Sequence, residues 1–97
     1  MNTGSKTIAN PRAFDHERAF QARADGVRQL GLWAADKIGL RGGHAQAYAL
    51  ALVSLDVGEA DDDTIMKPLL VDLQAYRVNR DELTGRLIGF VEQAAAH

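Results

Sequence analysis

The chain has 97 residues, which is the size of one small domain. Its net charge of −2 excludes the basic surface typical of a nucleic-acid-binding domain, and its lack of cysteine excludes disulfides, thiolate metal sites and a cysteine nucleophile. No apolar run reaches the roughly 18–20 residues of a membrane span, and the N-terminus lacks the apolar centre of a signal peptide. We therefore expect a cytoplasmic protein that does not cross a membrane.

The charge is divided unevenly along the chain. Residues 1–30 carry five Lys and Arg against three acids, a balance of +2, while residues 31–97 carry six against ten, a balance of −4. Residues 1–13 are polar and contain no apolar pattern, so we predict a disordered tail there. A mildly basic front end thus precedes an acidic body.

From Phe14 the pattern becomes helical. The apolar residues of this first helix recur three or four residues apart and form one face: Phe20, Ala24, Val27, Leu30 and Ala34. Trp33 flanks this face and is expected to pack in the core, since it offers the largest apolar surface in the chain. Gly39 suits the left-handed position that ends a helix.

Two glycines, Gly26 and Gly31, lie inside the first helix. Each costs about 1 kcal/mol relative to alanine, and marks either close packing against a neighbour or a point where the helix frays. The half before Gly26 is the weaker one. We predict that residues 14–25 form a mobile segment.

Three further helices are expected, over residues 43–55, over residues 63–77 and after Asn79. Pro68 interrupts the second of these, so that helix either kinks there or begins near Ile65. The predicted buried faces of the three helices are Ala45, Tyr48, Ala49, Leu52 and Leu55; Ile65, Leu69, Leu73 and Tyr76; and Leu83, Leu87, Phe90 and Ala94.

The last helix has the clearest start. Asn79 is a good N-cap, and Glu82 stands three residues later, as in a capping box. Gly85 and Gly89 offer a flat patch for a neighbouring helix. No stretch alternates at period two, so the predicted fold is all-α: a small four-helix bundle over residues 14–97 with a mobile N-terminal segment.

Patterns that carry chemistry are lacking in the sequence. No phosphate loop or dinucleotide fingerprint occurs, and His16, His44 and His97 have no metal-ligand spacing. The acidic residues between positions 56 and 63 do not follow the calcium-loop pattern and are interpreted as helix caps. We predict a protein that is not an enzyme and needs no cofactor or metal.

One segment is a candidate for binding a partner. Phe14 and Phe20 lie about 120° apart around a helix, in a charged stretch that runs from Phe14 to Arg23. Such a stretch can fold into a groove on another protein. Alternatively it extends the first helix and places Phe20 in the core.

Several short runs resemble a known family. L-G-L-W-A-A-D-K-I-G-L from Leu30, A-Q-A-Y-A from Ala45, the D-D-D triplet, L-x-D-L from Leu70 and the Val78–Asn79 turn resemble the zeta subunit of the F-type ATP synthase of alphaproteobacteria. The resemblance implies a four-helix bundle whose N-terminal segment inserts into the catalytic head and blocks ATP hydrolysis. The residues it assigns to this contact are Phe14, Asp15, His16, Glu17, Arg18, Phe20 and Arg23.

The alignment to that family can be made in two ways. If Phe14–Arg23 matches the inhibitory stretch, the first helix is shortened by roughly three turns, or about 18 Å. Without a gap, residues 20–28 match the later part of the helix, and residues 1–13 replace the inhibitory stretch. The alternative function is then a non-inhibitory relative that binds a small ligand, such as an adenine nucleotide, or another protein.

Overall fold

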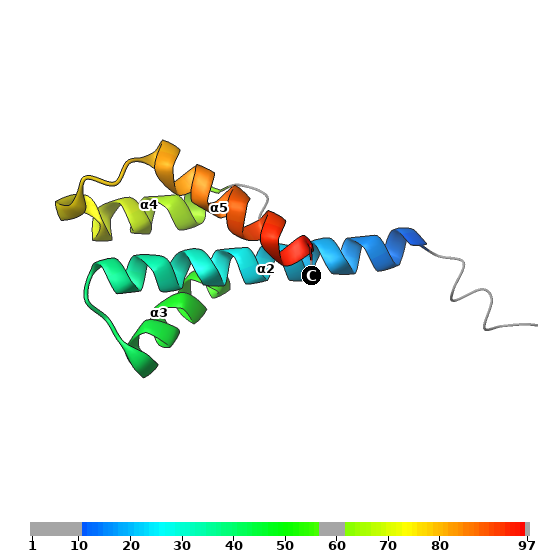
Figure 1. Cartoon of the computed structure of the whole chain (residues 1–97), viewed down its shortest axis with the longest axis horizontal. Coiled ribbons are helices and arrows are strands. Elements are labelled where there is room, and N and C mark those ends of the chain that lie inside the picture. The colour runs from blue at the N-terminus through cyan, green and yellow to red at the C-terminus, as the bar shows by residue number, and fades with distance from the viewer. Residues whose placement is uncertain (1–10, 57–61, 97) are drawn as a thin grey trace, which may run out of the picture.

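The computed structural model describes residues 11–56 and 62–96, with side chains from His16 onward. These residues form α2 (Pro11–Lys37), α3 (Gly42–Leu55), α4 (Asp63–Asp72), the 3₁₀ turn η1 (Gln74–Tyr76) and α5 (Arg80–Ala95) (Figure 1). They contain no strand. The predicted small all-α bundle is therefore confirmed.

Helix α2 is the element on which the others pack. Its contacts with α5 and with α3 are much the most extensive in the molecule, and Figure 1 shows these two helices along different sides of α2. Contacts among α3, α4 and α5 are fewer. One apolar core joins all four helices: Val27, Leu30, Ala34, Leu52, Ile65, Met66, Leu69, Leu73, Val78, Leu83 and Leu87.

The two glycines of α2 are sites of close packing. A Cβ atom at Gly26 would overlap Val91 Cγ2 and lie 2.9 Å from the amide nitrogen of Val91, and one at Gly31 would lie 2.8 Å from Ala49 Cα. The backbone of α2 can approach α5 at Gly26 and α3 at Gly31 this closely only because glycine has no side chain. Gly85 and Gly89 were predicted to offer a flat patch for a neighbouring helix, but none of the described helices packs there, since no described neighbour lies within 4 Å of a Cβ built at either position.

Two helix ends follow their sequence signals. Gly39 has φ +90°, and the amides of Gly39 and Leu40 donate to the carbonyls of Asp36 and Ala35, as in a Schellman motif. At the start of α5, Asn79 Oδ1 accepts a hydrogen bond of 2.9 Å from the amide of Glu82. Both predicted caps are confirmed.

The third predicted helix is too long at its C-terminal end. Helix α4 begins at Asp63, continues through Pro68 and ends at Asp72 instead of Arg77. Arg77 has φ +57°, a left-handed conformation that a helix interior excludes, and the chain turns there toward α5. Tyr76, predicted to face inward, is exposed as a consequence.

Two other boundaries also differ from prediction. Leu55 was expected in the core, but it closes α3 at the surface and is exposed. Helix α2 begins at Pro11, where a proline suits the first helical turn, so residues 11–13 belong to the helix and not to the predicted tail. Residues 1–10 lie outside the described part of the chain. In the described residues, no helix has the length and apolar character needed to span a membrane.

Candidate protein-binding arm

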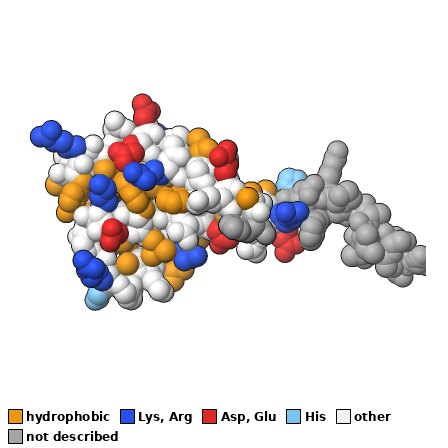
Figure 2. Space-filling view, in the orientation of Figure 1, with side chains coloured by type: hydrophobic (Ala, Val, Ile, Leu, Met, Phe, Trp, Pro, Cys, Tyr) orange, Lys and Arg blue, Asp and Glu red, His pale blue; other side chains and the backbone are white. Residues whose placement is uncertain are grey.

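The N-terminal part of α2 extends beyond the bundle. We call residues 11–21 the arm. All side chains from His16 to Gln21 are exposed, whereas Ala22, the next residue, is only 6% exposed. Figure 2 shows the described part of the arm standing clear of the bundle, and Figure 1 shows that α5 ends over the middle of α2. Among the described residues, the helices that pack on α2 do not reach residues 16–21, and these side chains are therefore exposed.

Phe20 is the large apolar side chain of this surface. It is 62% exposed, so the alternative that placed it in the core is wrong. His16, Glu17 and Arg18 are exposed beside it. Phe14 and Asp15 lie in the same helix, but their side chains are outside the described part of the structure. Contact with another molecule would remove the apolar area of this ring from water, which is favourable.

Arg23, at the base of the arm, has a different environment. Its Nε and Nη2 atoms donate to Asp56 Oδ2 and Oδ1 at 2.8 and 2.7 Å, and Nη2 also donates to Asp62 Oδ1 at 2.8 Å. The side chain of Asp56 is only 8% exposed. Hydrogen bonding to Asp56 outweighs burial and holds the pKa of Arg23 above its ordinary value. We call these three residues the Arg23 clamp.

The clamp joins three elements. Asp56 follows α3 and Asp62 precedes α4, so one guanidinium on α2 holds both helix ends. Asp62 was interpreted as a helix cap, but its side chain makes no capping hydrogen bond. Arg23 was assigned to the partner contact, whereas the structure engages it inside the molecule. Helical periodicity could not predict these pairs, because Asp56 and Asp62 lie 33 and 39 residues from Arg23 in the sequence.

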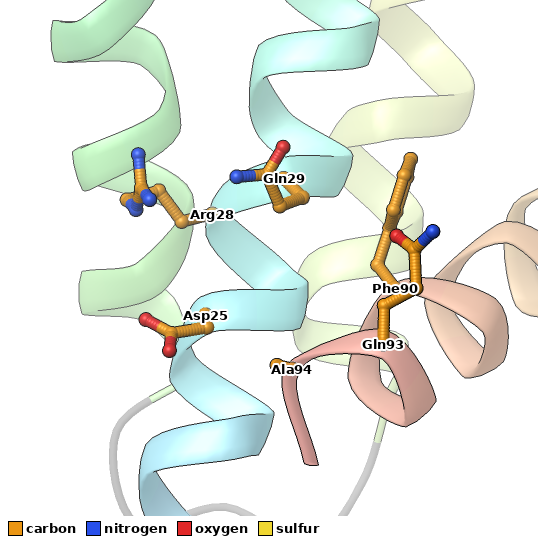
Figure 3. Close-up of a pocket in the computed structure, with 6 residues that line it drawn as sticks. All are labelled: Asp25, Arg28, Gln29, Phe90, Gln93 and Ala94. Atoms are coloured by element: carbon orange, nitrogen blue, oxygen red, sulfur yellow. The ribbon is translucent and has the colours of Figure 1, made fainter. Parts of the chain in front are cut away.

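A shallow pocket lies between α2 and α5. It has a volume of about 350 Å³ and is lined by Asp25, Arg28, Gln29, Phe90, Gln93 and Ala94 (Figure 3). Figure 3 shows Phe90 and Gln93 extending from α5 while Arg28 and Gln29 extend from α2. Asp25 places a carboxylate on the same rim as the guanidinium of Arg28, so the pocket carries both signs of charge.

Trp33 lies on the α5 side of α2. It is half-buried and packs against the core, while the guanidinium of Arg86 stands 4.2 Å and Lys37 Nζ 5.5 Å from its ring centroid. These distances are in the cation–π range. The packing of Trp33 against the core was predicted from its position beside the apolar face of the helix. Its contacts with Arg86 and Lys37 were not predicted.

The described side chains include no group of three or more His, Cys, Asp or Glu that could hold a metal ion. The described helices define a class of small all-α proteins in which one long helix carries the others and extends beyond them. Comparison with protein-family models identifies residues 5–97 as ATPase inhibitor subunit zeta. The chain therefore belongs to the ATPase inhibitor subunit zeta family. Neither the comparison with curated proteins nor that with solved structures gave a match.

Proposed function

We propose that this chain is a non-catalytic regulatory subunit that binds the catalytic head of the F-type ATP synthase in the cytoplasm and inhibits ATP hydrolysis. Two observations support the proposal: the family match over residues 5–97 and the exposure of Phe20 on an uncovered helix. The exposure of Phe20 is the observation on which the proposed mechanism depends. At 1.5 Å per residue the arm spans about 16 Å, enough to enter a groove between subunits.

The arm acts as a helix that docks in a groove. Burying the Phe20 ring contributes about 2 kcal/mol, and a helix that is already formed loses less conformational entropy when it binds. Charged side chains around the ring, those of His16, Glu17 and Arg18, meet polar groups at the rim of the groove. Phe14 and Asp15 belong to the same contact. Arg23 acts from the base of the arm.

The proposal is tested by ATP hydrolysis with a catalytic head from a matched source. Full-length protein inhibits, while a chain that begins at Ala22, and so keeps Arg23, does not. Phe20→Ala raises the concentration for half-maximal inhibition at least tenfold, which corresponds to about 1.4 kcal/mol. Leu50→Ala is the matched control, because Leu50 is 58% exposed on α3, away from the arm. Equal inhibition by full-length and shortened chains contradicts the proposal.

The alternative function, binding of a small ligand such as an adenine nucleotide, has one observation in its favour. The pocket between α2 and α5 offers an aromatic ring, Phe90, and one guanidinium, that of Arg28. However, Asp25 lines the same pocket and would repel a phosphate. Titration with ADP, followed by amide shifts, tests it: saturable shifts at Phe90 and Gln93 favour the ligand-binding function.

A further inference from the structure

The clamp stands at the boundary between the covered and uncovered parts of α2. Residues 16–21 are exposed, Ala22 is buried, and Gly26 is held against Val91. Arg23 therefore makes its three hydrogen bonds in the first turn of α2 that the bundle covers. If α2 unfolds from its N-terminal end, these hydrogen bonds must break before the unfolding reaches Gly26.

The arm needs such an anchor. Isolated helices shorter than about 12–15 residues are marginal in water, so the arm stays helical mainly as a continuation of the folded part of α2. Gly26 is the next weak point, because glycine is among the poorest helix formers. The fork of a guanidinium on one carboxylate fixes geometry as well as charge, which a single point contact does not.

We propose that Arg23, held by Asp56 and Asp62, is the positioning residue of the arm: it keeps the arm helical and fixes its exit from the bundle. The inference rests on the function proposed above. Arg23 then acts on binding through the population of helical arm and not through contact with the partner. If only the helical arm binds, the apparent dissociation constant equals the intrinsic one divided by the helical fraction.

Two measurements on full-length protein test the clamp. Backbone ¹³Cα shifts of residues 16–21 give the helical fraction of the arm, and ATP hydrolysis gives the concentration for half-maximal inhibition. In Arg23→Ala we expect the helical fraction to fall to about one third and the half-inhibitory concentration to rise by the same factor of about three. Maximal inhibition at saturating protein stays unchanged, because Phe14 and Phe20 are intact.

Three further variants sharpen the test. Arg80→Ala is the matched control: it removes an ion pair with Asp63 on the same α4 terminus but outside the clamp, and leaves both readouts unchanged. Arg23→Lys restores part of the helical fraction, since it keeps the charge without the fork. Asp62→Asn removes the more exposed partner, so the folded bundle survives even if Arg23→Ala unfolds it, and the arm still loses helix.

Each result decides between the clamp and its alternatives. An arm that keeps its full helical fraction in both Arg23→Ala and Asp62→Asn overturns the inference. A half-inhibitory concentration that rises well beyond the loss of helix also overturns it, because Arg23 would then contact the partner directly. If the unmodified chain fails to inhibit, the proposed function is wrong, whereas the shift measurement still judges whether the clamp holds the arm.

Discussion

Single residues set the distance between helices in this molecule. Gly26 and Gly31 let the backbone of α2 approach Val91 of α5 and Ala49 of α3 so closely that a Cβ atom has no room. Gly85, in contrast, lies in the middle of α5 with open space around it. The same residue type therefore has opposite consequences for stability at these sites.

We expect Gly26→Ala to destabilise the fold by about 1–3 kcal/mol, because the added methyl overlaps Val91 and forces the helices apart. Gly85→Ala, the matched control, should stabilise by about 0.5–1 kcal/mol through helix propensity alone. Urea unfolding followed by circular dichroism measures both. A stabilising Gly26→Ala would mean that α2 and α5 are not packed at this point.

The cap at Asn79 gives a second prediction at this scale. Asn79→Ala should lower the free energy of unfolding by about 1 kcal/mol, since the amide of Glu82 loses its acceptor. Asn79→Ser keeps an acceptor and should retain most of the stability. Chemical unfolding of the three proteins side by side gives the comparison, and equal losses in both variants would show that the side-chain oxygen is not the stabilising group.

At the scale of elements, a tyrosine links α3 to α4. The hydroxyl of Tyr48 donates to Asp72 Oδ2 at 2.7 Å. Burial, followed by the hydrogen bond to the carboxylate, raises the pKa of Tyr48 above its ordinary value of 10. The neutral form is therefore favoured in the folded protein, and the unfolded chain releases this proton first as pH rises.

The pH dependence follows from that direction. Because the folded pKa lies above the unfolded one, the contribution of Tyr48 to stability is complete below pH 10 and is lost as pH rises above it. Urea unfolding at pH 8 and pH 11 should show a smaller decline for Tyr48→Phe than for the unmodified chain. If the free energy of unfolding declined equally in both proteins, Tyr48 would not contribute to the loss of stability at alkaline pH. Arg23, whose pKa is also raised, should not affect stability in this range.

At the scale of the whole molecule, the core of the fold and the surface proposed to bind a partner occupy different parts of α2. The core lies beneath residues 27–34, whereas residues 16–21 make up an exposed surface. A chain that begins at Ala22 should keep its free energy of unfolding within about 0.5 kcal/mol. Leu69→Ala, in the core, should lose about 2–5 kcal/mol. A large loss of unfolding free energy on removing the arm would show that the arm contributes to the stability of the fold.

Much of the fold could be predicted because its signals are local. Helical spacing identified Val27, Leu30 and Ala34, and the caps at Gly39 and Asn79 followed from residue type alone. The exposure of Phe20 could not be predicted in this way. Its helical position is compatible with burial or exposure, and the choice depends on where the neighbouring helices end.

The sequence by itself determined the four helices, two of their caps, the family, and the apolar faces apart from Phe20, Leu55 and Tyr76. Each of these depends on residues near one another in the chain or on a short run of letters. The tertiary structure decided which glycines are packing sites, that Arg23 is bound inside the molecule, and that the arm is uncovered. Those features depend on distances between segments that lie far apart in the sequence, such as Gly31 and Ala49 or Arg23 and Asp56, the latter pair 33 residues apart. Such distances are set by packing and not by the local pattern.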